Sequence, residues 1–248
     1  MWTAGATVRD SESPSRYGTI VVIGGGCYGG YYVRQLGRAR AANALSWDRL
    51  VVVDRDARCP VAVDGAADVV LVVAEWANYL ERFLGMEART GDAIVPSPLM
   101  PHLLFDWLVG RAARAGRAVR TVAPPPIAGI PWQRAGDERT RFVSFAEWTC
   151  PVNCVEPAKC PHTRGERTWS MPVAARAHVD ASRGGDAPLD VALTFHCTHR
   201  AFGVGMIDVG EVLSAEATLL DLSAKGPVRA LVGTVSHCHG ALGVVEVR

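Results

Sequence analysis

The sequence has no excess of charge of either sign, no long apolar run and no apolar core near its amino end. Its 26 lysine and arginine residues balance 25 acidic residues, which gives a formal net charge of +1. That balance argues against the strongly basic surface of a protein that binds nucleic acid. No apolar run reaches the roughly 18 residues of a membrane span, so we expect no membrane insertion.

The composition is typical of a globular protein. Hydrophobic residues make up 49 % of the 248 residues and charged residues 21 %, which argues against wholesale disorder. Residues 1–17 are rich in Ser, Asp, Glu and Pro without periodicity, so we interpret them as a disordered tail. Because this stretch also lacks the apolar core of a signal peptide, we expect a cytoplasmic protein.

The cysteines are the first feature that points to chemistry. Their number is odd, and a reducing compartment keeps thiols free, so disulfides are disfavoured and metal binding or redox chemistry is favoured. The seven positions are Cys27, Cys59, Cys150, Cys154, Cys160, Cys197 and Cys238.

Short apolar runs alternate with helical patterns over residues 18–126. A helical pattern follows the first run, with Tyr32, Val33 and Leu36 on one face, and another follows Pro101. This alternation predicts an α/β domain with a parallel sheet covered by helices. The expected strands are Thr19–Ile23, Leu50–Val53, Val69–Ala74, Ala93–Val95 and Ala118–Val122.

Residues 127–248 predict a smaller α+β domain. Arg141–Trp148 alternates loosely like a strand, and a loop rich in Cys and Pro follows from Cys150 to Gly165. Val191–Phe195 and Leu231–Val235 are strand-like, and each runs into a His/Cys cluster. If these two strands are neighbours, both clusters lie at one edge of a sheet.

A glycine-rich loop directly follows the first predicted strand. Gly24, Gly26 and Gly29 match the G-x-G-x-x-G pattern, with a helical pattern behind it and Asp54 at the end of the next strand. The first glycine permits the tight turn, the second lets the backbone approach a pyrophosphate, and the third lets the helix pack closely. Asp54 stands where an acid binds the ribose hydroxyls, so the loop predicts a dinucleotide site, NAD or alternatively FAD.

This stretch resembles the Rossmann-type NAD(P)- and FAD-binding domains over residues 18–126. Among them it is similar to the precorrin-2 dehydrogenase domain of siroheme synthases and to the nucleotide-binding regulatory domain of potassium-uptake systems. The resemblance implies a Rossmann-like fold in which Gly24, Gly26, Gly29 and Asp54 bind the cofactor. The cysteine-rich half resembles no family of known activity.

The segment Cys150–Cys160 carries three cysteines within eleven residues, spaced C-x3-C-x5-C. Thiolates on one loop can converge on a metal, although this spacing matches neither a zinc ribbon nor the bacterial ferredoxin run. We expect Cys150, Cys154 and Cys160 to bind an iron–sulfur cluster, with Cys197 or Cys238 as a fourth ligand. A zinc site fits the same residues, and the neighbouring His199 and His239 are interpreted as core or surface residues.

Together the two halves predict an iron–sulfur and dinucleotide-binding redox protein, either an oxidoreductase or an electron-transfer component. Three alternatives remain open: a redox- or nucleotide-sensing regulatory module, an NAD-dependent tetrapyrrole dehydrogenase and a zinc-stabilised structural protein. We expect a redox partner protein or a homo-oligomer. No pattern of a general acid, base or nucleophile is recognisable, so an enzymatic mechanism stays open.

Overall fold

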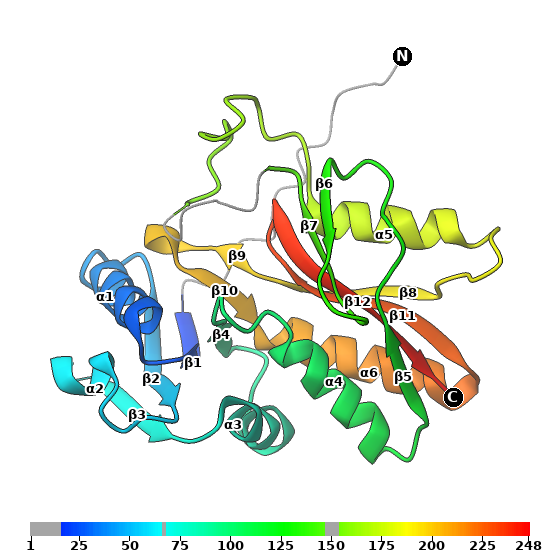
Figure 1. The fold of residues 1–248 in the computed structure, drawn as a ribbon. Helices are drawn as coiled ribbons and strands as arrows, with labels where there is room; N and C mark the ends of the chain where they lie inside the picture. The colour runs from blue at the N-terminus through cyan, green and yellow to red at the C-terminus, as the bar shows by residue number, and fades with distance from the viewer. Residues whose placement is uncertain (1–15, 66–67, 147–153) are drawn as a thin grey trace.

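The fold is known from a computed structural model that describes residues 16–65, 68–146 and 154–248. It is a mixed α/β structure with two mixed sheets and helices (Figure 1). Cys150 and most of the predicted tail lie outside the described residues. No helix among those residues is both long and apolar enough to cross a membrane.

The first sheet has the strand order β3-β2-β1-β4-β10-β9. Its first four strands are parallel, and β10 and β9 are antiparallel to their neighbours. The apolar runs predicted from the sequence fill its centre, because Val21, Val22 and Val51 are fully buried. The strands are β1 (Arg16–Ile23), β2 (Ser46–Asp54), β3 (Val69–Val73), β4 (Ala93–Val95), β9 (Thr198–His199) and β10 (Gly205–Asp208).

Helices connect the parallel strands. The longest of them, α1 (Cys27–Ala41), packs the predicted face of Tyr32, Val33 and Leu36 into the core. Three shorter segments follow, namely α2 (Pro60–Asp64), α3 (Trp76–Arg82) and a π-helical turn, η1 (Phe83–Glu87). The predicted strands and the first helix are therefore confirmed, with β1 starting three residues earlier, at Arg16.

The second sheet has the order β6-β7-β12-β11-β8, with β5 paired to the far end of β12. It is antiparallel except where β8 runs parallel to β11. The helix α5 packs on one face, whereas α4 and α6 pack on the other (Figure 1). The remaining elements of the chain are α4 (Leu103–Arg114), β5 (Val119–Val122), β6 (Trp132–Ala135), β7 (Arg141–Ser144), α5 (Met171–Ser182), β8 (Val191–His196), η2 (Ala201–Gly203), α6 (Val209–Lys225), β11 (Val228–Val235) and β12 (His239–Val247).

One expected strand lies in the other sheet. Val119–Val122 forms β5 as predicted, but it pairs with β12 and not with the parallel strands. The position beside β4 belongs to β10, whose Met206 and Ile207 are fully buried. The reason is physical: β10 carries the apolar side chains that a central position needs, whereas β5 carries Arg120.

Candidate functional site

The glycine loop has the backbone geometry that its sequence predicts. Gly24 has φ +92°, a conformation that favours glycine, and its N–H donates to the carbonyl of Val53 at 2.8 Å. A Cβ at Gly29 would lie 1.8 Å from the carbonyl oxygen of Gly24, so the helix sits as close to the strand as glycine allows. A Cβ at Gly26 would meet nothing within 4 Å, so nothing in the described fold requires glycine there.

Asp54 is bound to the loop itself. Its Oδ2 accepts the N–H of Gly25 at 2.6 Å, and its Oδ1 accepts the N–H of Asp56 at 2.9 Å. The α2 segment lies against the same loop, because Val61 donates its N–H to the carbonyl of Gly25 at 3.1 Å. The side chain of Cys59 covers Gly25, whose Cβ would lie 2.4 Å from its sulfur. Asp54 therefore braces the loop in addition to any role toward a ligand.

A pocket of about 300 Å³ borders the first turn of α1, where Tyr28 lines it. Five stretches of the chain contribute to it, from Tyr28 to Ala241. Most of its wall is apolar, from tyrosine, proline, valine and alanine side chains. The lining residues with thiol, carboxylate, imidazole or hydroxyl side chains are Cys154, Glu156, Cys197, His199, Ser236, Cys238 and His239. We call this the cysteine pocket.

The cysteine pocket contains three of the five predicted metal ligands, Cys154, Cys197 and Cys238. Cys160 is buried elsewhere in the loop, where its sulfur accepts the N–H of Thr163 at 3.5 Å. Cys150 lies outside the described residues. Within the part of the chain that the structure describes, no three His, Cys, Asp or Glu side chains are grouped so that they could hold a metal ion.

Sheet topology explains why Cys197 and Cys238 line the same pocket. The strands β8 and β11 are parallel neighbours, with His196 opposite Val235 at their carboxyl ends. Cys197 follows the first strand directly, and Cys238 sits in the turn after the second. The expectation that both clusters lie at one edge of a sheet is confirmed.

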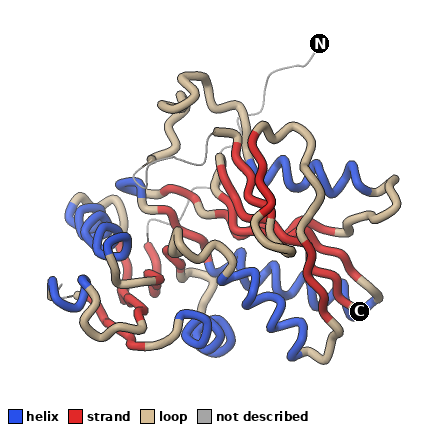
Figure 2. Tube along the Cα trace, viewed as in Figure 1, coloured by secondary structure: helices blue, strands red, loops and turns tan. Residues whose placement is uncertain are grey.

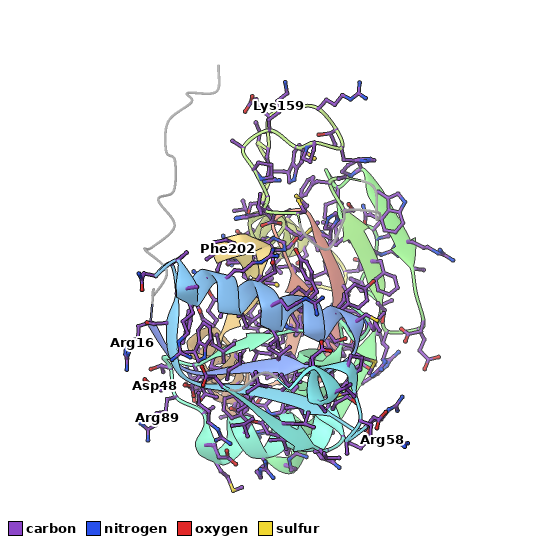
Figure 3. All side chains as sticks on the ribbon, turned by 90° about the vertical axis from the view of Figure 1, so that its left-hand side faces the viewer. Arg16, Asp48, Arg58, Arg89, Lys159 and Phe202 are labelled. Carbon is purple, nitrogen blue, oxygen red and sulfur yellow. The ribbon has the colours of Figure 1, made fainter. Side chains whose placement is uncertain are left out.

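The loop between β7 and α5 supplies the third cysteine. It forms the long loop at the top of the molecule (Figure 2), and Lys159 lies at its outer end (Figure 3). Its two ends are fastened to the turn between β11 and β12. Near the start, Glu156 accepts the N–H of His237 at 3.2 Å, and at the end Met171 donates its N–H to the carbonyl of His237 at 3.0 Å.

Glu156 is a buried carboxylate, although a lone acidic residue in a polar loop is expected to point to water. Its Oε2 lies 3.1 Å from Nδ1 of His199, and only 6 % of its side chain is exposed. Its backbone has φ +47°, a conformation that costs energy for a residue with a side chain. Burial raises the pKa of Glu156, but the contact with His199 and the charges of His199 and His237 outweigh it and lower the pKa to about 2.

The two cysteines at the strand ends have different surroundings. Cys197 lies over Gly205, where a Cβ would come within 2.6 Å of its sulfur. Burial first, and the charge of Glu156 second, raise the pKa of Cys197 to about 12. The sulfur of Cys238 accepts the indole N–H of Trp169 at 3.3 Å, and burial raises the pKa of this thiol as well.

The histidines belong to the pocket rather than to a separate core. His199 and His239 both line it, and Nδ1 of His239 lies 2.9 Å from the hydroxyl of Ser144. Burial lowers the pKa of His239. His199 lies two residues after Cys197, and His239 lies one residue after Cys238. This closeness in the sequence was the signal that could have placed both histidines in the site.

The cysteine pocket lies beside the carboxyl ends of the parallel strands. Pro96, Ser97 and Pro98 come directly after β4, and Tyr28 belongs to the first turn of α1. The neighbours β1 and β4 are where the strand order turns, since β2 and β3 lie on one side of β1 and β4 on the other. Open α/β sheets bind ligands in the crevice at such a point.

Comparison with known proteins yields one family. The family model AF_1314_C, described as "Uncharacterized protein, C-terminal domain", matches residues 103–248. The chain belongs to this family. The matched region begins at α4 and contains the whole second sheet together with β9 and β10. No curated protein and no solved structure matches the chain.

Proposed function

We propose that this protein is a redox protein, an oxidoreductase or electron-transfer component, that binds a dinucleotide on the glycine loop and a thiophilic metal centre in the cysteine pocket. One observation carries the proposal. The pocket brings three thiols together with Tyr28 of the helix that follows the glycine loop and with the residues after β4. A cofactor bound along the loop and a centre bound by the thiols would therefore be neighbours.

The glycine loop fits a dinucleotide in three respects. Gly26 faces open space, so a ligand has room to approach its backbone. The first turn of α1 has no side-chain cap and no acidic residue, which leaves its N–H groups available to phosphate oxygens. The Asp54 carboxylate keeps acceptor capacity for a ribose hydroxyl besides its two backbone bonds, because each oxygen has two lone pairs.

The cysteine pocket fits a metal in its donor chemistry. Thiols and imidazoles are the ligands of iron–sulfur clusters and zinc sites. Cys154, Cys197 and Cys238 would supply three ligands, and Cys150 or a pocket histidine the fourth. Because the described donors are not yet grouped around one point, loading requires the loop that carries Cys154 to move. A bound iron–sulfur centre would supply one-electron transfer.

The chain's own residues have definite tasks in this proposal. Glu156 fastens the loop of Cys154 to His199 and to the turn that carries Cys238. Tyr28 and the prolines after β4 supply part of the apolar wall of the pocket.

The metal proposal is tested by anaerobic purification followed by an absorption spectrum and by iron, sulfide and zinc analysis of the same sample. We expect broad visible absorption that dithionite bleaches, with iron and sulfide present. C197S and C238S should lower the metal content at least about tenfold, since each removes a ligand. C160S and C27S are the matched controls and should retain it, because neither residue lines the pocket.

Other outcomes decide between the remaining interpretations. A colourless protein with one zinc per chain would favour the zinc-stabilised structural alternative. A colourless protein without metal, purified under the same conditions, would contradict the metal proposal and leave function to the glycine loop.

The dinucleotide proposal has its own test in G26A. The added methyl group meets nothing within 4 Å, so the free energy of unfolding should stay within about 0.5 kcal/mol of the wild type. It would occupy the space of a pyrophosphate, so the affinity for NADH, NADPH or FAD should fall at least about tenfold. Calorimetric titration with each nucleotide measures this. Equal affinities in G26A and wild type would contradict nucleotide binding at this loop.

A further inference from the structure

The strand β3 forms an open edge of the first sheet. It pairs with β2 on one side, and among the described residues no strand pairs with its other side (Figure 1). On the β2 side, Ala74 donates its N–H to the carbonyl of Asp54 at 3.0 Å. Because alternate residues of a strand in a parallel pair turn their backbone toward the partner, Val69, Leu71 and Val73 turn theirs toward the open side. This edge therefore presents a row of backbone N–H and C=O groups.

The sequence of β3 lacks the devices that keep such an edge unpaired. Residues Val69–Val73 are all valine or leucine, with no charge and no proline, and their register with β2 contains no bulge. Natural proteins protect edges with charges, prolines or bulges, since an unprotected apolar edge pairs with another strand. Val70 is 42 % exposed and Val73 is 54 % exposed, so apolar side chains reach the surface on both faces of the sheet. The edge is therefore suited to a strand as its partner.

The residues of β3 read the same in both directions. The sequence VVLVV is symmetric about Leu71, so an antiparallel second copy centred on Leu71 sets Val69 opposite Val73 of that copy. In this register the three residues that face outward lie directly opposite one another. This is the arrangement in which two opposite residues of antiparallel strands exchange both N–H···O bonds. The strand is thus complementary to a second copy of itself.

The surroundings of the edge fit the same partner. Asp68, directly before β3, would lie opposite Ala74 of the second copy, so like charges do not meet there, and Asp68 already pairs with Arg40 of α1 at 3.5 Å. A shallow, mostly apolar groove of about 380 Å³ lies between α1, β2 and the start of β3, where Val69 lines it. Opposite residues share a face of the sheet, so Val73 of the second copy would lie beside this groove. Each copy would therefore cover the exposed Val73 of the other.

We propose that β3 is the contact through which two copies of this chain form a symmetric dimer, with their first sheets joined into one. The proposal goes beyond the redox function proposed above and depends on no cofactor. A two-fold interface uses the same surface on both subunits, which a self-complementary strand supplies. A pair of five-residue strands is smaller than the standard interface of about 800 Å² per partner, so we expect a reversible dimer with a dissociation constant on the order of 10 μM.

Variants of Val70 with opposite charges test the proposal by sedimentation velocity of the full chain, from about 1 to 100 μM. In the proposed register the two Val70 side chains are diagonal neighbours on one face, roughly 7 to 8 Å apart. V70K and V70E each place like charges there and should weaken association at least about tenfold. An equimolar mixture of the two variants should regain association, because the charges then attract. V173K changes a valine of α5 that is 53 % exposed and should dimerise like the wild type.

Three results of the sedimentation experiment would overturn the proposal. They are a wild type that stays monomeric to about 100 μM, a folded V70K that dimerises like the wild type, and a mixture of folded V70K and V70E that stays monomeric. In the last case the edge would serve a strand of another protein and not a second copy.

Hydrogen exchange of the wild type decides the question even if both Val70 variants fail to fold. Pairing protects the outward N–H groups of β3, so their exchange should slow at least about threefold from the lowest to the highest concentration. Mass spectrometry of the peptide that contains Val69–Val73 measures this, with a peptide from α5 as the control. Exchange at β3 that is independent of concentration would overturn the proposal.

Discussion

The glycine loop and the cysteine pocket share the first turn of α1, but they are built in opposite ways. The loop, its bracing acid and its close helix packing all come from residues 24–54. The cysteine pocket collects stretches from Tyr28 to Ala241 and from both sheets. A local site is specified by the steric needs of a few consecutive residues. A site assembled from distant stretches is specified by how strands pair.

The two regions also differ in how they handle charge. Asp54 is satisfied by the backbone N–H groups of Asp56 and Gly25, which lie 2 and 29 residues away, so it joins the ends of two neighbouring strands. Glu156 is satisfied by His199 and by the N–H of His237, which lie 43 and 81 residues further along the chain. We therefore expect substitutions in the glycine loop to disturb local packing. Substitutions at Glu156 should instead weaken the contacts between distant elements of the chain.

The largest effect is expected at the closest contact of the loop. In G29A the new methyl group would lie 1.8 Å from the Gly24 carbonyl oxygen, so the helix has to move away from β1. We expect the free energy of unfolding to fall by more than about 3 kcal/mol, as for severe overpacking. Urea denaturation followed by circular dichroism measures it.

Gly37 provides the control on the same helix. Nothing lies within 4 Å of its Cβ position, and it is exposed. G37A should stabilise the protein by about 0.5 to 1 kcal/mol, because alanine favours a helix interior over glycine. If G29A were as stable as the wild type, the steric account of the local site would be wrong.

The sequence predicted the local region well. The runs Thr19–Ile23, Leu50–Val53 and Ala93–Val95 are strands because consecutive β-branched residues suit positions buried on both faces. The glycine spacing predicted the tight turn and the close helix contact, since both depend on residues six or fewer positions apart. Asp54 was placed at the loop, although its bonds to Gly25 and Asp56 were not foreseen.

The distant region could be predicted only in part. Cysteine spacing pointed to Cys154 and Cys160 alike, and the clusters at strand ends pointed to Cys197 and Cys238. Spacing could not show that Cys154 lines the pocket while the sulfur of Cys160 lies at Thr163. The run Val119–Val122 predicted a strand but not its partner, because β12, with which it pairs, lies more than 100 residues further along the chain. The burial of Glu156 could not be predicted, because it depends on contacts with His199 and His237, whereas a lone acidic residue in a polar loop is expected to point to water.

The second largest effect is expected for E156Q. Because the folded-state pKa of Glu156 is lowered to about 2 from 4.5, its ionisation stabilises the fold above about pH 4.5. The shift corresponds to roughly 3 kcal/mol at pH 7, an amount lost as the pH falls through the folded-state pKa. Urea denaturation of wild type and E156Q should therefore differ by this amount at pH 7, and the difference should shrink from pH 4.5 toward pH 2.

E166Q is the control in the same loop. Glu166 is exposed and takes part in no ion pair among those formed by the described residues, so E166Q should change stability by less than about 0.5 kcal/mol at any pH. A pH-independent difference between wild type and E156Q would contradict the electrostatic account and leave only the hydrogen bond to His237.

The smallest effect is expected for D54N, which tests whether the local site serves the fold alone. The amide keeps one acceptor oxygen, so one of the two bonds to Gly25 and Asp56 is lost and stability should fall by about 1 kcal/mol. D56N is the matched control, since Asp56 is exposed and accepts only the N–H of Arg58.

Calorimetric titration of both variants with NADH gives the second readout. If Asp54 also binds ribose, D54N should weaken NADH binding at least about fivefold while D56N leaves it unchanged. Weaker folding with unchanged affinity would mean that Asp54 only braces the loop. The contrast between the two regions would then be sharper, because the local motif would serve structure and the distant cysteine pocket would carry the chemistry.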